Sequence, residues 1–236
     1  MISIVIPTLN EEKYIEKLLT CLKNQTYKYF EIIIIDANSQ DKTKDIIRLY
    51  NNFLKIKIIN SEKRNVSFQR NLGLKNSKNE SVLFLDADTT FDNDFLENAL
   101  KEIKENDIKI AGCLLYPDSK DNIYNLFFSL FRIYINLLHS YIGFNGCCIF
   151  TLKSIHNKIN GFDENIKVGE DYDYTKRLKK LSKLSLLKTV KIKTSVRRFE
   201  KYGRLRTGIK YLLIGLYILL FGNITKDTFK YKFNEK

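Results

Sequence analysis

The chain has 236 residues, of which 44% are hydrophobic, and its 40 Lys and Arg against 27 Asp and Glu give a formal net charge of +13. The length suits one compact domain, and an apolar fraction typical of a globular core excludes a wholly disordered chain. With 10 glycines and 2 prolines, collagen-like and proline-rich linker classes are excluded as well. A basic chain first suggests nucleic acid, an anionic membrane or a phosphate-bearing substrate as its partner.

The first half of the chain alternates predicted strands with predicted helices. Runs of β-branched residues predict strands, and helical spacing predicts the helices that follow them. The predicted strands cover 2–7, 30–35, 55–60 and 82–85, and the predicted helices cover 11–24, 42–52, 67–75 and 91–105. This alternation indicates an α/β fold with a mostly parallel sheet between layers of helices, whose ligand lies beyond the carboxyl ends of the strands. Polar clusters at 8–11, 36–41 and 86–88 follow predicted strands, so we expect them to share one site.

Two apolar segments occupy the second half. Polar residues at steps of three and four predict one long helix at 122–142, with an apolar face wider than a surface helix needs. An apolar run at 211–221 is too short to cross a bilayer, which takes about 20 residues. Met1 leads directly into a strand-like run without a visible secretory signal, and the 4 cysteines lack zinc-ligand spacing. Buried thiols in a reducing cytoplasm are therefore expected.

Asp86 and Asp88 directly follow the fourth predicted strand. Two carboxylates at this spacing can reach one divalent cation, and Mg²⁺ or Mn²⁺ accepts such oxygen ligands together with phosphate oxygens. A solvated turn is the alternative. The segments 7–11 and 36–41 also fit strand ends with helix caps, Asn10 among them, and 70–73 fits a surface helix. The occurrence of all of these segments in one order favours a common function.

These residues resemble glycosyltransferase family 2. The matching segments are PTLNE at 7–11, IIIIDANSQD at 32–41, RNLGLKNSKNESVLFLDAD at 70–88, NGFDE at 160–164 and GEDYDYTKRL at 169–178. The resemblance covers about residues 1–200 and implies the GT-A fold, an α/β fold with a mostly parallel central sheet flanked by helices. It also implies an inverting enzyme that moves a sugar from a nucleotide-sugar to an acceptor with the help of Mn²⁺ or Mg²⁺.

The resemblance further implies roles for single residues on the donor side. Asp88 and Asp86 would hold the metal, Asp36 would contact the base and Arg70 would lie near the nucleotide. The full set of implied substrate-binding residues is Pro7, Thr8, Leu9, Glu11, Asp36, Asn38, Arg70, Asp86, Ala87, Arg197 and Arg198. After its second strand the chain has Asp36-Ala37-Asn38-Ser39, whereas the family commonly has Asp-Asp-Gly-Ser.

An inverting transfer needs a carboxylate that takes the proton of the acceptor. By resemblance that base is Asp171, with Glu170 beside it; the alternative is an acidic helix N-terminus, where the helix dipole favours carboxylates. Many relatives have a metal-binding histidine in the region of 195–203, and this chain has none there. The metal is therefore expected on Asp88, diphosphate and water. Arg197 and Arg198 would clamp the diphosphate, because guanidinium groups match phosphate oxygens, with a solvated surface as the alternative for each.

The basic charge is concentrated near the end of the chain. Residues 167–210 hold 15 basic and 4 acidic side chains, whereas residues 1–166 hold 21 of each. A nucleic-acid-binding module would leave the acidic strand ends unexplained, and a membrane-surface scaffold would leave Asp86, Asp88 and Asp171 without a role. The enzyme interpretation is therefore favoured, with no nucleic-acid partner.

The basic segment 176–210 leads directly into the apolar run 211–221. Cations beside a short apolar helix bind anionic lipid headgroups, which predicts a protein at the inner face of the cell membrane that acts on a lipid-linked or glycan acceptor. The alternative is that the apolar helices pack on each other or form a homodimer interface. The expected donor is a UDP-sugar rather than a GDP-sugar. The expected domains are a catalytic domain at 1–200, with a nucleotide-sugar-binding half at 1–110 and an acceptor-binding half at 111–200, and a membrane-association segment at 201–236.

Overall fold

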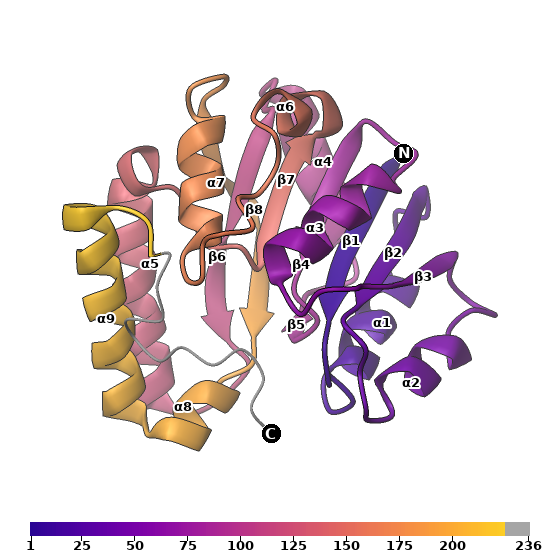
Figure 1. Cartoon of the computed structure of the whole chain (residues 1–236), viewed down its shortest axis with the longest axis horizontal. Helices are drawn as coiled ribbons and strands as arrows, with labels where there is room; N and C mark the ends of the chain where they lie inside the picture. Colours follow the sequence, from indigo (N-terminus) through magenta and orange to yellow (C-terminus); the bar gives the residue numbers. More distant parts are fainter. Residues whose placement is uncertain (225–236) are drawn as a thin grey trace.

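The computed structural model describes residues 1–224, apart from the side chains of residues 141, 142, 219 and 221 (Figure 1). Within that range the strands form one sheet in the order β3-β2-β1-β4-β7-β6-β8-β5. The strands are β1 (Ile2–Thr8), β2 (Phe30–Asp36), β3 (Ile56–Asn60), β4 (Ser81–Leu85), β5 (Thr89–Thr90), β6 (Ile110–Pro117), β7 (Cys148–Leu152) and β8 (Leu184–Thr194). The helices are α1 (Ile15–Lys23), α2 (Thr43–Leu49), α3 (Val66–Lys75), α4 (Phe95–Glu105), α5 (Asn122–Ile142), α6 (Lys153–Lys158), α7 (Glu170–Leu178), α8 (Arg197–Tyr202) and α9 (Arg204–Phe221).

The predicted parallel half of the sheet is formed by β1 to β4. β1 pairs in parallel with both β2 and β4, and β2 pairs in parallel with β3. The register places Thr8 beside Asp36 and Asp36 beside Asn60, so the ends of three strands meet at one edge. This edge carries the first two polar clusters that the sequence singles out.

Helices cover both faces of the sheet, as the alternation of elements predicts. Ile4 of β1 belongs to a buried cluster with residues of α1, α2 and α4, whereas its neighbour Val5 belongs to a cluster with residues of α3, α6 and α7. Successive side chains of a strand point to opposite faces, which explains the division. The close approach of α3 to β1 depends on Gly73, since a Cβ there would lie 2.2 Å from Cγ1 of Val5.

The second half of the chain adds antiparallel strands. β7 lies between β4 and β6 and is antiparallel to both, β8 is parallel to β6, and β5 is antiparallel to β8. β5 and β8 bring residues 89–90 against residues 193–194. The end of the turn at Asp86-Ala87-Asp88, hereafter the DxD turn, thus lies beside the segment that leads into α8. Cys113, Cys147 and Cys148 are buried free thiols, and Cys21 is partly buried.

Two predicted helices begin later than expected. The first begins at Ile15 rather than at residue 11, and the fourth begins at Phe95 rather than at residue 91. The interpretation of Asn10 as a helix cap is wrong, because Asn10 has a φ of 55° and precedes a turn. Its side-chain oxygen instead accepts a hydrogen bond from the Gln40 N–H at 2.9 Å. This part of the chain joins two loops, as described below.

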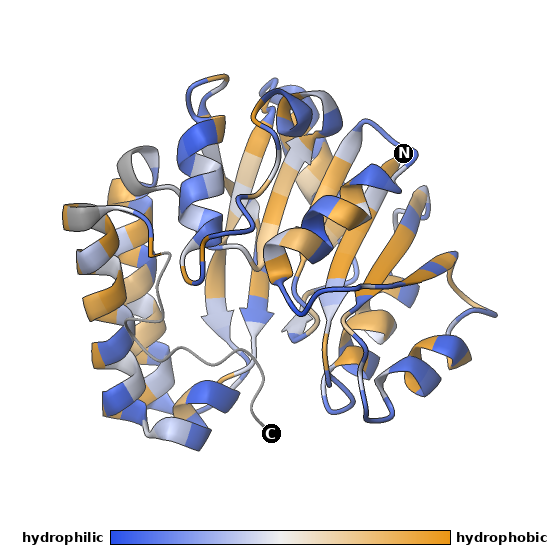
Figure 2. Cartoon of the chain, viewed as in Figure 1, coloured by the Kyte–Doolittle hydropathy of each residue, from blue (hydrophilic) through white to orange (hydrophobic). Residues whose placement is uncertain are grey.

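α5 and α9 lie side by side at the end of the molecule opposite β3 (Figure 1), and both carry long apolar stretches (Figure 2). α5 has the bounds that the polar spacing predicts, and α9 begins at Arg204, well before the apolar run. Small residues of α9 face α5, with Gly208 next to Phe127 and Gly215 next to Tyr134. No helix described in residues 1–224 combines the length and the apolarity needed to cross a membrane.

Candidate functional site

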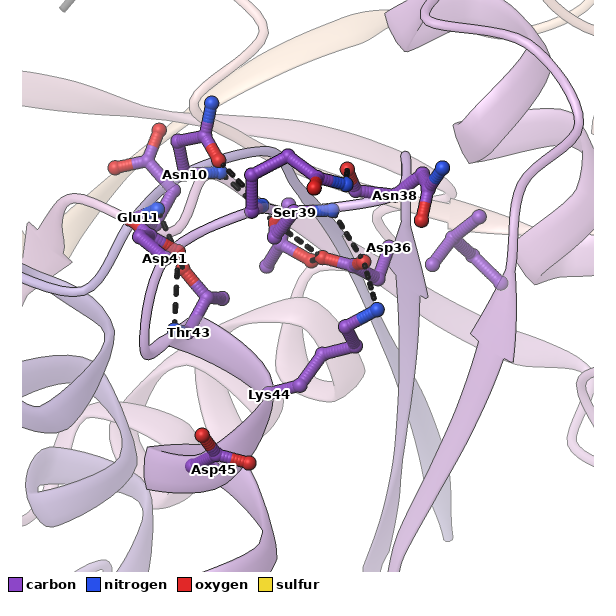
Figure 3. Close-up of polar contacts among 12 residues, drawn as sticks. Asn10, Glu11, Asp36, Asn38, Ser39, Asp41, Thr43, Lys44 and Asp45 are labelled. Carbon is purple, nitrogen blue, oxygen red and sulfur yellow. Dashed lines mark hydrogen bonds and ion pairs between the residues drawn. The ribbon is translucent and has the colours of Figure 1, made fainter.

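The loops after β1 and β2 are joined through the carboxylate of Asp36 (Figure 3). Asp36 has no exposed surface and accepts hydrogen bonds from the Ser39 N–H at 2.9 Å and from the Ser39 hydroxyl at 2.5 Å. The Thr8 hydroxyl also donates to it at 3.1 Å, and the Lys44 ammonium lies 3.9 Å away. The predicted base-contacting residue is thus the residue that fixes the shape of the loop.

Further bonds tie the two loops together. The N–H of Asn10 donates to the Ser39 hydroxyl at 2.9 Å, and the N–H of Glu11 donates to the Thr43 hydroxyl at 2.7 Å. Asn10 and Asn38 both have positive φ values, of 55° and 64°, a conformation that asparagine adopts more readily than most residues. Of the predicted pocket residues, Pro7 and Thr8 are buried and Asn38 is exposed.

Arg70 lies at the centre of a buried ion-pair network. It comes from α3, has 2% of its surface exposed, and donates to Oδ1 of Asp86 at 2.9 Å and to Oε1 of Glu170 at 3.0 Å. It also donates to the carbonyl oxygen of Gly146 at 3.2 Å. Burial disfavours its charged form, but Asp86 and Glu170 together raise the pKa of Arg70, so the guanidinium stays charged. The sequence placed Arg70 near the nucleotide; the structure places it between the DxD turn and α7.

Asp171 lies in the first turn of α7, next to this network. Its Oδ2 accepts a hydrogen bond from the Gly146 N–H at 2.5 Å, and its Oδ1 accepts one from the Tyr172 N–H at 2.9 Å. Burial, and after it the neighbouring Glu170 carboxylate, raise the pKa of Asp171 to about 7, against the lowering effect of Arg70. A carboxylate with this pKa can accept a proton at neutral pH. The two sequence interpretations of Glu170 and Asp171 are compatible, because both residues lie at an acidic helix N-terminus in which Glu170 is buried and Asp171 partly buried.

Gly146 is a site residue that the sequence motifs do not identify. A Cβ at this position would lie 2.9 Å from Arg70 Nη2 and 2.9 Å from the Cβ of Asp171. Only a residue without a side chain lets the loop before β7 approach both groups so closely. The sequence shows only a connection with two glycines at 143–148, and the partners of Gly146 lie 76 and 25 positions away along the chain.

Asp88 and Arg197 form the other side of the site. Asp88 Oδ2 accepts a hydrogen bond from the Ser195 hydroxyl at 2.7 Å and lies 3.3 Å from Arg197 Nη2. The Arg197 guanidinium also makes a two-pronged bond to Glu11, at 2.6 and 2.9 Å. The structure thus brings together Glu11, Asp88 and Arg197 from distant parts of the chain. Glu11 is 5% exposed, and burial raises its pKa despite the pairing with Arg197.

Arg198 points elsewhere. Its Nη1 lies 3.4 Å from the Tyr211 hydroxyl of α9, and its carbonyl oxygen accepts a hydrogen bond from the Thr207 hydroxyl. The two neighbouring arginines, predicted to act together on a diphosphate, therefore face different parts of the molecule. Leu9 is partly buried and Ala87 is 4% exposed in the loops that carry Glu11 and Asp88.

The carboxylates of Asp86 and Asp88 have the donor chemistry that Mg²⁺ or Mn²⁺ requires. Oxygen ligands from one or two carboxylates suit these ions when substrate phosphates and water supply the rest. In the part of the chain that the structure covers, no group of three or more His, Cys, Asp or Glu side chains is arranged to hold a metal by itself. The residues therefore fit a cation that is shared with a phosphate-bearing ligand.

The comparisons with known proteins identify the family. The sequence model described as glycosyl transferase family 2 matches residues 3–160. The chain belongs to this family. Among curated relatives, a dolichyl N-acetyl-alpha-D-glucosaminyl phosphate 3-beta-D-2,3-diacetamido-2,3-dideoxy-beta-D-glucuronosyltransferase of Methanococcus voltae is 41% identical over 47% of this chain and 37% of its own length. An uncharacterised glycosyltransferase of Rickettsia typhi is 27% identical over 88% of this chain and 71% of its own length.

Solved structures of glycosyltransferases show the same fold. TarS of Staphylococcus aureus in complex with UDP-GlcNAc matches 82% of this chain and 58% of its own, with a TM-score of 0.68 and 23% identity. The mannosyltransferase PcManGT of Pyrobaculum calidifontis in complex with GDP-Man and Mn²⁺ matches 83% of this chain and 56% of its own, with a TM-score of 0.69 and 20% identity. The predictions of family 2 and of the GT-A fold are confirmed. The chain spans little more than half of each of these structures and just over a third of the Methanococcus relative.

Proposed function

We propose that this family 2 protein is an inverting glycosyltransferase that moves a sugar from a nucleotide-sugar to a hydroxyl or phosphate acceptor. One observation carries the proposal: Asp171, a partly buried carboxylate with a pKa of about 7, lies beside the same Arg70 that pairs with Asp86 of the DxD turn. A proton acceptor and the carboxylates suited to a cation and a diphosphate therefore share one site. A UDP-sugar remains the expected donor, in line with the UDP-GlcNAc complex of TarS, and the GDP-Man complex of PcManGT makes a GDP-sugar the alternative.

In the proposed reaction the acceptor oxygen attacks the anomeric carbon from the face opposite the diphosphate. A new C–O bond forms, the bond to the diphosphate breaks with its electron pair on the leaving oxygen, and the anomeric configuration inverts. Asp171 takes the acceptor proton, and the hydrogen bonds from Gly146 and Tyr172 orient its oxygens. A divalent ion on Asp88, with Asp86 nearby, would supply positive charge to the departing diphosphate.

The two predicted halves of the catalytic domain divide these tasks. Residues 1–110 supply Glu11, Asp36 and the DxD turn for the donor, and residues 111–200 supply Asp171 for the acceptor. Arg197 reaches back into the donor half. The boundary proposed at residue 200 lies inside α8, whose Phe199 packs on Tyr211 of α9.

A thermal-shift screen of nucleoside diphosphates with Mn²⁺ and Mg²⁺ tests the donor site. We expect UDP with Mn²⁺ to raise the Tm by about 5–10 °C at a hundredfold excess over Kd, because a ligand that binds only the folded state stabilises it by about 2.7 kcal/mol. Asp88→Ala should lose the metal-dependent part of this shift. Asp45→Ala, which removes an exposed carboxylate on α2, is the matched control and should keep it. A metal-dependent shift that is equal in Asp88→Ala and wild type would contradict the metal assignment.

We further propose that the α5–α9 pair binds the anionic inner surface of the cell membrane, next to a lipid-linked or glycan acceptor. The outer faces of both helices carry large exposed apolar side chains: Ile123, Leu126, Leu130, Ile133 and Leu137 of α5, and Leu205, Ile209, Leu212, Leu213, Leu216 and Leu220 of α9. These residues are hereafter called the apolar face. Apart from the adjacent Leu212 and Leu213, they recur at steps of three and four and form a stripe on each helix. Arg204, Arg206 and Lys210 adjoin it on α9. The name of the Methanococcus relative, which includes a dolichyl phosphate, supports a lipid-linked acceptor.

The alternative to membrane binding was that the two apolar helices pack on each other or form a homodimer interface, and the first part of it agrees with the structure. α5 and α9 do pack on each other, as Gly208 and Phe127 show, but this contact leaves the apolar face outside. Exposed apolar surface of this extent marks an interaction site. Basic residues beside it complement anionic lipid, at about 1 kcal/mol per Lys or Arg near the surface. These features support residues 201–224 of the predicted membrane-association segment; residues 225–236 of that segment lie outside the described part of the chain.

Flotation with liposomes tests this surface. We expect the protein to float with vesicles that contain anionic lipid at low salt and to bind less at high salt, where charges are screened. Leu130→Ser with Leu212→Ser should lower the partition coefficient at least about tenfold, since burying one leucine contributes about 1.5–3 kcal/mol. Leu49→Ser, at an apolar residue of α2 that is 70% exposed, is the matched control. No flotation at low salt, or a dimer that covers the same leucines, would overturn the membrane proposal.

A further inference from the structure

Arg197 makes contacts that the proposed reaction does not explain. Its Nη1 and Nη2 bond both oxygens of Glu11, at 2.6 and 2.9 Å, and Nη2 also lies 3.3 Å from Oδ2 of Asp88. One guanidinium thus bridges two carboxylates of the predicted donor site. The side chain is 24% exposed, and its Cζ lies 4.7 Å from the centre of the Tyr14 ring.

The backbone that carries Arg197 is held in place on both sides. Before it, the Ser195 hydroxyl donates to Asp88 and the Ser195 N–H donates to the Asp88 carbonyl oxygen. After it, Phe199 is buried among aromatic rings of α5 and α9, with Tyr124 and Tyr211 at 5.8 and 5.7 Å between centroids. Only the side chain of Arg197 is therefore expected to change partners when a ligand enters.

The guanidinium is also the nearby cation that balances Glu11. Burial raises the pKa of Glu11, Arg197 opposes this, and Asp88 and Asp86 raise it further. Among residues 1–224, Asp86 has Arg70 as its ion-pair partner, whereas Glu11 and Asp88 share Arg197. Without Arg197, the buried Glu11 and the partly buried Asp88 would lack this counter-charge.

A divalent cation that binds Asp88 would lie close to the Arg197 guanidinium. Oδ2 of Asp88 already accepts the Ser195 hydroxyl and lies within ion-pair distance of Arg197. The cation and the guanidinium would repel each other, because both are positive and would share one carboxylate. A diphosphate offers Arg197 another anion, in a geometry that suits its fork.

We propose that Arg197 is an internal counter-ion that competes with a divalent cation for Asp88 and is drawn away by the donor diphosphate. This inference rests on the proposed function for its ligands. Its consequence is positive coupling: the cation alone binds weakly, and nucleoside diphosphate and cation each strengthen the binding of the other by the same factor. Arg197 is in this view a positioning residue that makes loading of the donor and the cation a concerted event.

The test is calorimetric titration of the folded chain with Mn²⁺, with UDP, and with each in the presence of the other. For wild type we expect Mn²⁺ alone to bind at least tenfold more weakly than Mn²⁺ with saturating UDP. Arg197→Gln should bind Mn²⁺ alone about tenfold more tightly than wild type and UDP alone more weakly, so the coupling falls. Arg48→Gln, which breaks an exposed ion pair with Asp45 on α2, is the matched control and should leave all constants unchanged.

Arg197→Lys covers the case in which the glutamine variant does not fold. Lysine keeps the charge but cannot bond Glu11 and Asp88 with one planar fork, so an intermediate gain in Mn²⁺ affinity is expected. An unchanged or weaker affinity for Mn²⁺ alone in the folded variant overturns the inference. That result is distinct from failure of the proposed function, which would appear as no UDP binding by wild type with any divalent ion.

Discussion

Replacing Asp171 with asparagine is expected to lower kcat by about a thousandfold, within the 10²–10⁴ range typical of a general base. Asparagine has the same shape, and its amide oxygen can still accept the Gly146 N–H, but it cannot take the acceptor proton. Donor affinity should change little, because Glu11, Asp88 and Arg197 lie in other segments of the site. Turnover is measured as UDP release and affinity by calorimetry. Residual turnover together with weakened nucleotide affinity would contradict the assignment.

The pH dependence of kcat in the wild type is a second test of Asp171 as the base. The base must be ionised, and burial raises the pKa of Asp171 to about 7, so kcat should fall about tenfold per pH unit below that value and level off above it. Asp173→Asn, two residues further along α7, is the matched control. Asp173 pairs with Arg177 and Asn223 rather than with Gly146, so its variant should keep the profile. A profile that is flat between pH 5 and pH 8 would contradict the assignment.

Replacing Arg70 with methionine is expected to destabilise the fold by about 3–5 kcal/mol at pH 7.5. Asp86 and Glu170 would then lack the ion-pair partner that they share, and breaking a buried pair on one side costs this much. Methionine preserves much of the apolar length of arginine, so the loss reports mainly the charge. Urea unfolding measures the effect.

Arg48→Met is the comparison variant for this measurement. Its ion pair with Asp45 has both side chains more than half exposed, so its removal should change the free energy of unfolding by less than about 1 kcal/mol. The loss of unfolding free energy in Arg70→Met and that in Arg48→Met should become more similar toward acidic pH, because protonated carboxyl groups no longer need a cation. Equal effects of the two substitutions at pH 7.5 would show that the Arg70 network contributes no more than a surface pair.

The sequence predicted the donor side of the fold because its signals are local. Isoleucine-rich runs followed by polar residues identify β1 and β2, and parallel pairing then places Thr8 beside Asp36 without further information. The bounds of α5 were predicted from its polar spacing, and its wide apolar face is explained by contacts on one side and exposure on the other. The error at Asn10 arose because a good capping residue also suits a left-handed turn.

The side-chain contacts inside the site could not be predicted from local signals in the sequence. Arg70 pairs with Glu170 across 100 positions of the chain, through a contact that exists only when α3 and α7 pack on the same face of the sheet. Gly146 looks like a loop residue until Arg70 and Asp171 are placed on either side of it. Neighbouring Arg197 and Arg198 have the same residue type and the same local pattern, and only the placement of α8 between β8 and α9 separates their directions.

The bond between Glu11 and Arg197 joins residues 186 positions apart and has a consequence for how the protein is made. Chains fold from the N-terminus as they are synthesised, and β1 to β4 can form their parallel half early. At that stage Glu11 and Asp88 are present without the guanidinium that later balances them. A chain that stops before residue 197 therefore lacks the cation that balances Glu11 and Asp88 in the proposed donor site. The proposed donor site is therefore complete only once residue 197 has been synthesised and both sides of the site are present.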